Sequence, residues 1–368
     1  MLSKRDETIM RKFRNISLSI LIVVTIMIIG ICGFYNYMLS PVSKNNDIVE
    51  IEIPQNTSSR EIAKILKNNY LIRDEKIFLI YIKIFKVNNM KAGYYDLSRD
   101  MGVKKIVETL QEGSKKNPNQ IDITFKEGIT MRDIAKVISS STNNSYDDVI
   151  AKANDISYID SLKEKYWFIT DDIKNDSIYY KLEGYLFPDT YRFDNKDVTV
   201  EEIFNKMINE MATVLEPYKE DILKKSLSVH QILTLASMVE KEAATTSVRS
   251  KVASVFINRL NKNMSLGSDV TTRYAFKIDD QKQILTKAQY NTKNPYNTRV
   301  TDGSMNGKLP VGPICTLSIE SIKASIYADN TDYLYFIANI KTLETFFYNN
   351  VVDFNAKKSE LQSVNGGF

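Results

Sequence analysis

The chain has 368 residues, of which 43% are apolar and 26% are charged, so it has the composition of a globular protein with room for two or three domains. Its 49 Lys and Arg residues against 45 Asp and Glu leave a net charge of only +4, too weak to indicate a nucleic-acid partner. Two cysteines and one histidine, His230, exclude a disulfide framework and a His-rich zinc site. A Ser-His-Asp triad stays possible, but carboxylates are the more promising chemical groups.

An apolar run near the N-terminus predicts a single transmembrane helix over residues 16–38. Residues 16–34, ISLSILIVVTIMIIGICGF, carry no charge and are long enough to span a hydrocarbon core. Five basic and two acidic side chains precede the run, an excess of +3 that predicts a cytoplasmic N-terminus at 1–15 and an extracellular body. A cleaved signal peptide has the same polarity and is the alternative.

Small strand-helix units follow a polar linker at residues 39–48. VEIEIP alternates apolar and charged residues like a half-buried strand, and TSSREIAKILKNN has the cap and spacing of a helix. A similar pair, QIDITF and GITMRDIAKVISS, recurs 72 residues later. Such units resemble LysM modules, so we predict a LysM-like glycan-binding region over 49–145; a chance match between generic units is the alternative. Between the copies, the pattern predicts a helix at 76–85, a strand at 92–98 and a helix at 103–111.

The segment KLEGYLFPDTYRF, residues 181–193, interleaves aromatic and acidic side chains. Sugars present apolar ring faces and hydroxyl rims, so aromatic platforms beside carboxylates suit a glycan cleft. Glu183, Tyr185, Asp189 and Tyr191 are therefore candidate substrate-binding residues. The same alternation is also typical of a buried strand.

The segment SVHQILTLASMVEKEA predicts a helix that opens on a capping box formed by Ser228 and Gln231. On a helical wheel Glu240 lies at the edge of the apolar face, whereas Glu242 projects further from its centre. A carboxylate held against apolar surface has a raised pKa, the property of a general acid. This geometry favours Glu240, and a structural ion pair with Lys241 or Arg249 is its alternative.

Two later segments add candidate binding residues. VRSKVASVFINRLNKNMSLGSDVTTRYAF begins as a helix and continues into an Asn- and Gly-containing loop, and NPYNTR with GKLPVGPI is rich in turn formers that could wall a cleft. Surface solvation or a plain structural loop is the alternative for these residues. The candidates are Asn258, Arg259, Ser268, Asp269, Tyr296, Asn297 and Thr298.

The segments EGYLFPDTY, VEKEA, VASVFINRL, NPYNTR and TDYLYFIAN together resemble the membrane-anchored endolytic murein transglycosylases of the YceG-like (MltG) family. The resemblance covers Ile51 to about Asn355. It implies a mixed α+β catalytic domain over 146–355, with Glu240, the first glutamate of VEKE, as the catalytic acid. Two features depart from the family pattern: Val270 replaces a usual proline, and the stretch TLETFFYNNVVDFN lacks the usual histidines. Residues 356–368 are predicted to be a C-terminal tail.

The resemblance implies cleavage of the bond between N-acetylmuramic acid and N-acetylglucosamine in nascent peptidoglycan. One carboxylate suffices, because the sugar's own C6 hydroxyl closes a 1,6-anhydro ring, and neither metal nor cofactor is needed. The expected partners are glycan strands and peptidoglycan synthases, with no nucleic acid. Two alternatives stay open: a non-catalytic peptidoglycan-binding scaffold, and a muramidase-type hydrolase with a second carboxylate such as Asp189, Glu242 or Asp269.

Overall fold

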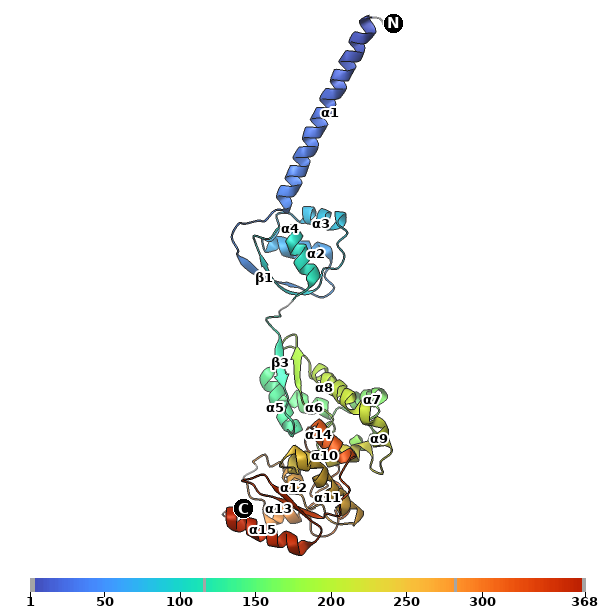
Figure 1. Ribbon diagram of the computed structural model, residues 1–368, viewed down its shortest axis with the longest axis vertical. Coiled ribbons are helices and arrows are strands. Elements are labelled where there is room, and N and C mark those ends of the chain that lie inside the picture. The colour runs from blue at the N-terminus through green and yellow to red at the C-terminus, as the bar shows by residue number, and fades with distance from the viewer. Residues whose placement is uncertain (1–3, 115–116, 281–282, 366–368) are drawn as a thin grey trace. The chain divides into compact units, whose positions relative to one another are not determined.

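The computed structural model describes residues 4–114, 117–280 and 283–365 (Figure 1). The chain forms two compact units, Met1–Asn119 and Gln120–Phe368. Helices and short antiparallel strand pairs occur in both, so the predicted α+β class is confirmed at this level.

The first unit begins with the long helix α1 (Lys4–Leu39), drawn in blue in Figure 1. Its stretch Ser17–Leu39 is long and apolar enough to cross a membrane, and the rest of the protein buries none of the most apolar 18-residue window within it. Length and composition fit a membrane anchor or a signal sequence. The end of α1 is held to the unit by Arg73, whose guanidinium lies 4.6 Å from the Tyr37 ring centroid and donates to the carbonyl of Pro41 at 2.5 Å.

A two-stranded sheet with three helices forms the rest of this unit. In β1 (Ile48–Ile53), Ile51 and Ile53 point into the core, and Glu50 and Glu52 point outward, as the alternation predicts. The helices bury Leu66, Phe78 and Leu110 against them. The other elements are β2 (Gly93–Ser98), α2 (Ser59–Asn68), α3 (Glu75–Ile84) and α4 (Val103–Glu112).

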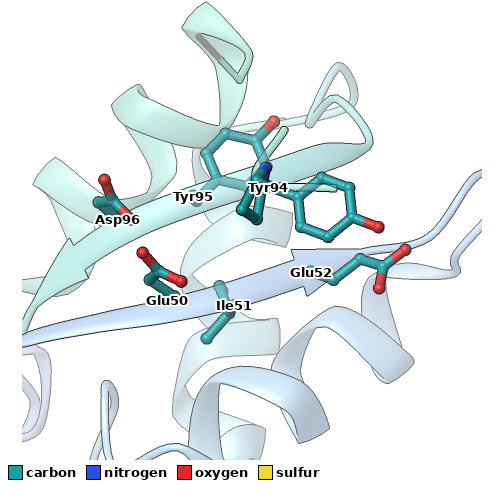
Figure 2. A pocket seen from close by; sticks show the side chains of 7 residues that line it. Glu50, Ile51, Glu52, Tyr94, Tyr95 and Asp96 are labelled. Atoms are coloured by element: carbon teal, nitrogen blue, oxygen red, sulfur yellow. The ribbon is translucent and has the colours of Figure 1, made fainter. Parts of the chain in front are cut away.

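The outer face of this sheet is acidic (Figure 2). Glu50 pairs in register with Asp96, and Glu52 with Tyr94. These residues and Pro118 line a small pocket of about 210 Å³. Tyr94 is the single aromatic ring on this outer face among the pocket-lining residues, because Tyr95 turns into the core. A LysM-like fold for this region is not confirmed.

The second copy of the strand-helix repeat belongs to the second unit. Both copies have the predicted local structure, including capping boxes at Ser58 and Thr130. However, β3 (Ile121–Thr124) pairs with β4 (Thr190–Phe193), and α5 (Met131–Ser141) packs into the larger core. The structure therefore divides the chain after Asn119, not after residue 145 as the sequence predicted, because the apolar face of the second copy finds its partners further along the chain.

Helix α10 (Val229–Glu242) runs through the core of the second unit and packs against α11, α12 and α14. Residues 351–365 form helix α15, so the predicted C-terminal tail is helical as far as residue 365, and residues 366–368 lie outside the described part. The remaining elements of this unit are α6 (Tyr146–Ala153), α7 (Ile156–Lys165), α8 (Val200–Leu215), α9 (Lys219–Leu223), α11 (Arg249–Asn261), α12 (Asp269–Ala275), α13 (Lys287–Asn291), α14 (Ile319–Ile326), β5 (Tyr335–Ala338), β6 (Thr345–Tyr348), α15 (Val351–Asn365), and short 3-10 helices at Asp171–Lys174, Glu216–Tyr218 and Thr246–Val248.

Candidate active site

The C-terminal end of α10 carries both glutamates of the VEKE segment. The helix begins as predicted, with Ser228 accepting from the backbone N–H of Gln231 and Gln231 accepting from that of Ser228. Because successive residues are about 100° apart, Glu240 and Glu242 project to nearly opposite sides of the helix. The two carboxylates therefore have separate surroundings.

Glu242 lies at the base of a large cleft. One carboxylate oxygen accepts a hydrogen bond from the Ser268 hydroxyl at 2.5 Å. Burial raises the pKa of Glu242, a shift that the Ser268 hydrogen bond opposes; the nearby Asp269 adds to it, and the Arg299 and Arg259 guanidinium groups oppose it. A buried carboxyl group with a raised pKa can hold a proton at neutral pH and donate it.

The cleft has a volume of about 860 Å³. Its walls combine rings with charged side chains, including Arg299, which forms a 2.8 Å ion pair with Asp269 and lies 4.7 Å from the Tyr290 ring centroid. Four of the candidates that the sequence analysis named, Glu242, Arg259, Ser268 and Asp269, line it. The other lining residues are Phe256, Ser265, Leu266, Gly267, Tyr290, Arg299, Tyr335, Phe336, Ile337, Ala338, Ile340, Phe354, Lys358 and Gln362.

Buried hydroxyl and amide groups hydrogen-bond to the backbone of segments that form this cleft. The Thr298 hydroxyl accepts from the backbone N–H of Ser268 at 3.0 Å. The amide nitrogen of Asn297 donates to the carbonyls of Gln289, Tyr290 and Thr292. Tyr296, Asn297 and Thr298 are fully buried. Their contacts therefore fit a role in positioning cleft residues, and direct contact with a glycan stays a prediction.

On the other side of α10, Glu240 is held by three donors. Arg249 donates at 2.9 Å, the backbone N–H of Ser318 at 3.0 Å, and the Ser318 hydroxyl completes the set. The Glu240 side chain is 7% exposed and that of Arg249 13%. The ion pair with Arg249 that the sequence left open is thus present, whereas Lys241 donates instead to the carbonyl of Gly128 at 3.1 Å.

A further acidic side chain, Glu127, adjoins the Glu240 site and was not singled out from the sequence. Burial and the charges of Glu240 and Glu320 raise the pKa of Glu127, while Arg249 opposes the shift. Glu127 comes directly before Gly128. A Cβ atom added to Gly128 would lie 3.8 Å from Cγ of Glu240. This part of the molecule therefore concentrates acidic groups around a single arginine.

Glu183 and Tyr185 lie in the core. Both oxygens of Glu183 accept from the backbone N–H of Met131, the first residue of α5, and one accepts from the Tyr274 hydroxyl at 2.9 Å. Burial raises the pKa of Glu183 to about 8. The hydroxyl of Tyr185 lies 2.7 Å from Nδ1 of His230. Both residues are buried away from the cleft, and their role in substrate binding stays a prediction.

The remaining candidates lie outside the cleft or serve its frame. The side-chain amide of Asn258 donates to the carbonyls of Thr331 and Tyr333, which ties α11 to the segment before β5. Tyr191 is buried in β4 and donates to the carbonyl of Phe187 at 2.8 Å. Asp189 is exposed on the turn before β4, and its main chain accepts from Phe125.

The single histidine does not form a serine triad. His230 bonds the Tyr185 hydroxyl through one ring nitrogen and the carbonyl of Val311 through the other, at 2.9 Å. Neither nitrogen bonds a serine hydroxyl in the described part of the chain. The residues that the structure describes also contain no group of three potential ligands placed to hold a metal ion.

Several cleft residues were not predicted. Tyr290, Arg299, Lys358 and Gln362 line the cleft, yet they come from α13, a loop and α15, which the sequence motifs did not connect. Arg299 stood inside a motif that was noted, and its charge beside the predicted turn was the one signal available. The other three have ordinary surroundings in the sequence.

The family model described as "YceG-like family" matches residues 51–360. The chain belongs to the YceG-like family. Over 92% of both chains it is 37% identical to a Bacillus subtilis (strain 168) protein named endolytic murein transglycosylase. A Streptococcus pneumoniae (serotype 2) protein with the same name is 31% identical over 89% of this chain and 62% of its own length.

A solved structure is also similar to this fold. The crystal structure of a putative yceG-like protein from Listeria monocytogenes matches with a TM-score of 0.59 and 35% sequence identity. The match covers 85% of this chain and 99% of that one. The family assignment therefore extends over both units of the chain.

Proposed function

We propose that this YceG-like protein is an endolytic lytic transglycosylase that cuts the bond between N-acetylmuramic acid and N-acetylglucosamine in nascent peptidoglycan. The product is a 1,6-anhydro-muramic end, and the cuts limit strand length. The observation that carries this proposal is the buried carboxyl group of Glu242 in an 860 Å³ cleft. Relatives of nearly full length that are named for this activity support it.

We assign the acid/base role to Glu242, two residues beyond the glutamate that the sequence favoured. A general acid must carry a proton near neutral pH and must reach the substrate. Burial raises the pKa of Glu242, and it lines the cleft. Glu240 instead accepts hydrogen bonds from three donors, and it does not line the cleft.

In the proposed reaction, the carboxyl group of Glu242 donates its proton to the glycosidic oxygen, and the bond to the anomeric carbon breaks. The carboxylate that forms then removes the proton from the C6 hydroxyl of the same muramic acid. That oxygen attacks the anomeric carbon and closes the anhydro ring, so no water is consumed. The Ser268 hydroxyl, 2.5 Å away, stabilises the carboxylate in the intermediate stage.

A muramidase-type hydrolase is the second candidate function, because Asp269 also lines the cleft and could activate water. The carboxylate of Asp269 is held in a 2.8 Å ion pair with Arg299 in this structure, which favours the transglycosylase. Mass spectrometry of digested glycan strands distinguishes the two, since anhydro ends support the transglycosylase and new reducing ends support the hydrolase. No cleavage at all would favour a non-catalytic scaffold.

We further propose that α1 is a retained anchor, with residues 1–15 in the cytoplasm and the two units outside the cell. The apolar stretch Ser17–Leu39 supports the anchor, and the basic excess before it supports the orientation. We extend the proposal to glycan binding by the first unit and to peptidoglycan synthases as partners, since a tethered enzyme meets strands where they are made. Recovery of a shortened soluble protein after fractionation would refute the anchor.

A further inference from the structure

Helix α15 contributes a stripe of one aromatic and two polar side chains to the cleft. Phe354, Lys358 and Gln362 all line it, and they are spaced four residues apart, which places them on one face of the helix about 6 Å apart along its axis. The sequence pattern did not predict this helix or its position. The stripe runs along the wall of the cleft and is separate from the end of α10 that carries Glu242.

Packing of Phe354, and of residues on the other faces of α15, fixes this orientation. Phe354 stacks on Tyr335 with ring centroids 5.2 Å apart, and Leu361 is 3% exposed. The ammonium group of Lys357 lies 4.1 Å from the Phe346 ring centroid and forms a 2.7 Å ion pair with Glu360. These contacts hold the helix against the β5–β6 hairpin, so Lys358 and Gln362 are presented to the cleft.

The charge in the cleft is unbalanced. Its lining residues include three cations, Arg259, Arg299 and Lys358, and two carboxylates, Glu242 and Asp269. Asp269 is paired with Arg299, and Arg259 is occupied by the carbonyls of Leu334 and Leu266. Even with both carboxylates ionised, the three cations leave an excess of positive charge in the cleft. Lys358 is exposed, and no ion pair or hydrogen bond of its side chain is found among the described residues.

We propose that Lys358, assisted by Gln362, binds a carboxylate group of the peptidoglycan strand and so makes α15 a specificity-determining wall of the cleft. The inference rests on the proposed function, because it concerns the same cleft. Two carboxylates have this chemistry: the lactyl group of muramic acid when no peptide is attached, and the acidic groups of the stem peptide when one is. A neutral N-acetylglucosamine polymer has neither.

The test compares Lys358→Gln with wild type in the full-length chain in detergent. We expect KM for uncut, peptide-bearing strands to rise about fivefold while kcat is unchanged, and the difference to shrink at high salt. Lys358→Arg should restore most of the affinity. The matched control is Lys225→Gln, which makes the same charge change near the start of α10, about 20 Å along the helix from Glu242, at a residue that is exposed and does not line the cleft.

The source of the carboxylate follows from a second substrate. If the effect of Lys358→Gln disappears on strands stripped of peptides by an amidase, the stem peptide supplies it; if the effect persists, the lactyl group does. Equal KM for Lys358→Gln, Lys225→Gln and wild type on both substrates would overturn the inference. Failure of the proposed function has a different signature, because wild type would then yield no anhydro ends; binding of strands in the Glu242→Gln background, measured as Kd, would still test Lys358.

Discussion

The two glutamates at the end of α10 lie two residues apart, yet their surroundings differ in the property that decides their chemistry. Glu240 accepts hydrogen bonds from a guanidinium, a backbone N–H and a hydroxyl. Glu242 has one hydroxyl donor, and burial raises its pKa. This difference in donors is why we propose Glu242 as the acid, and the variants below test that proposal against Glu240.

The largest effect should come from Glu242→Gln. The amide is nearly isosteric but can neither give nor take the proton, so we expect release of anhydro-ended fragments to fall by about 10² to 10⁴. Thermal unfolding should change little, since the amide can still accept from Ser268 and no charge is buried. Near-normal cleavage by this variant would return the acid role to Glu240.

Glu240→Gln should chiefly affect stability. It removes the carboxylate that bonds directly to the buried guanidinium of Arg249, so we expect a loss of about 3 kcal/mol in the free energy of unfolding. The control is Glu320→Gln, which touches the same arginine at 4.0 Å from an exposed position and should cost under about 0.5 kcal/mol. A Glu240→Gln protein that unfolds like wild type and has lost cleavage would reverse the comparison of the two glutamates.

Glu183 is a third buried carboxyl group, and it does not line the cleft. It therefore tests the effect of burial on its own, without catalysis. Its pKa in the folded protein is about 8 against an ordinary 4.5, so between these values the unfolded chain releases a proton that the folded chain retains. Stability is therefore fully present below about pH 4.5 and falls as pH rises towards 8, by on the order of 4 kcal/mol. The free energy of unfolding of Glu183→Gln should change less with pH across this range than that of wild type. An equal change in both proteins would show that Glu183 does not control the pH dependence.

Ser268→Ala should give the smallest effect. The hydroxyl lowers the pKa of Glu242 by donating to its carboxylate, so its removal should raise that pKa further. Because the protonated form is the active acid, the decline of kcat/KM at high pH should then move to higher pH, with a loss of about fivefold at the optimum. Ser265→Ala is a control at the cleft wall, and a pH profile that does not move in Ser268→Ala would remove Ser268 from the mechanism.

The sequence allowed the local elements to be predicted better than the site. The alternation in β1, the capping box at Ser228 and the apolar face of α10 depend on neighbouring residues, and the structure agrees with each of them. The choice between Glu240 and Glu242 could not be made this way. A helical wheel describes one helix, whereas burial of Glu242 comes from Ser268 and the segments around it, which follow α10 in the chain.

The cleft could be predicted only in part, for the same reason. Arg259, Ser268 and Asp269 were found because they stand inside recognisable segments, but Tyr296 and Asn297 share such a segment and are buried. A motif reports that a stretch matters and does not report which of its side chains face solvent. The opposite case is Lys358, which lines the cleft although nothing around it in the sequence indicates a cleft.

The cleft takes side chains from residue 242 to residue 362, and this fixes when it can first exist during synthesis. In the orientation proposed above, a chain that is made and exported from its N-terminus delivers α10 before α15. Until α15 is in place, the cleft beside Glu242 lacks one of its sides. A partly made chain is therefore not expected to cut nascent glycan strands. The order of the sequence thus delays activity until the second unit has been completely delivered.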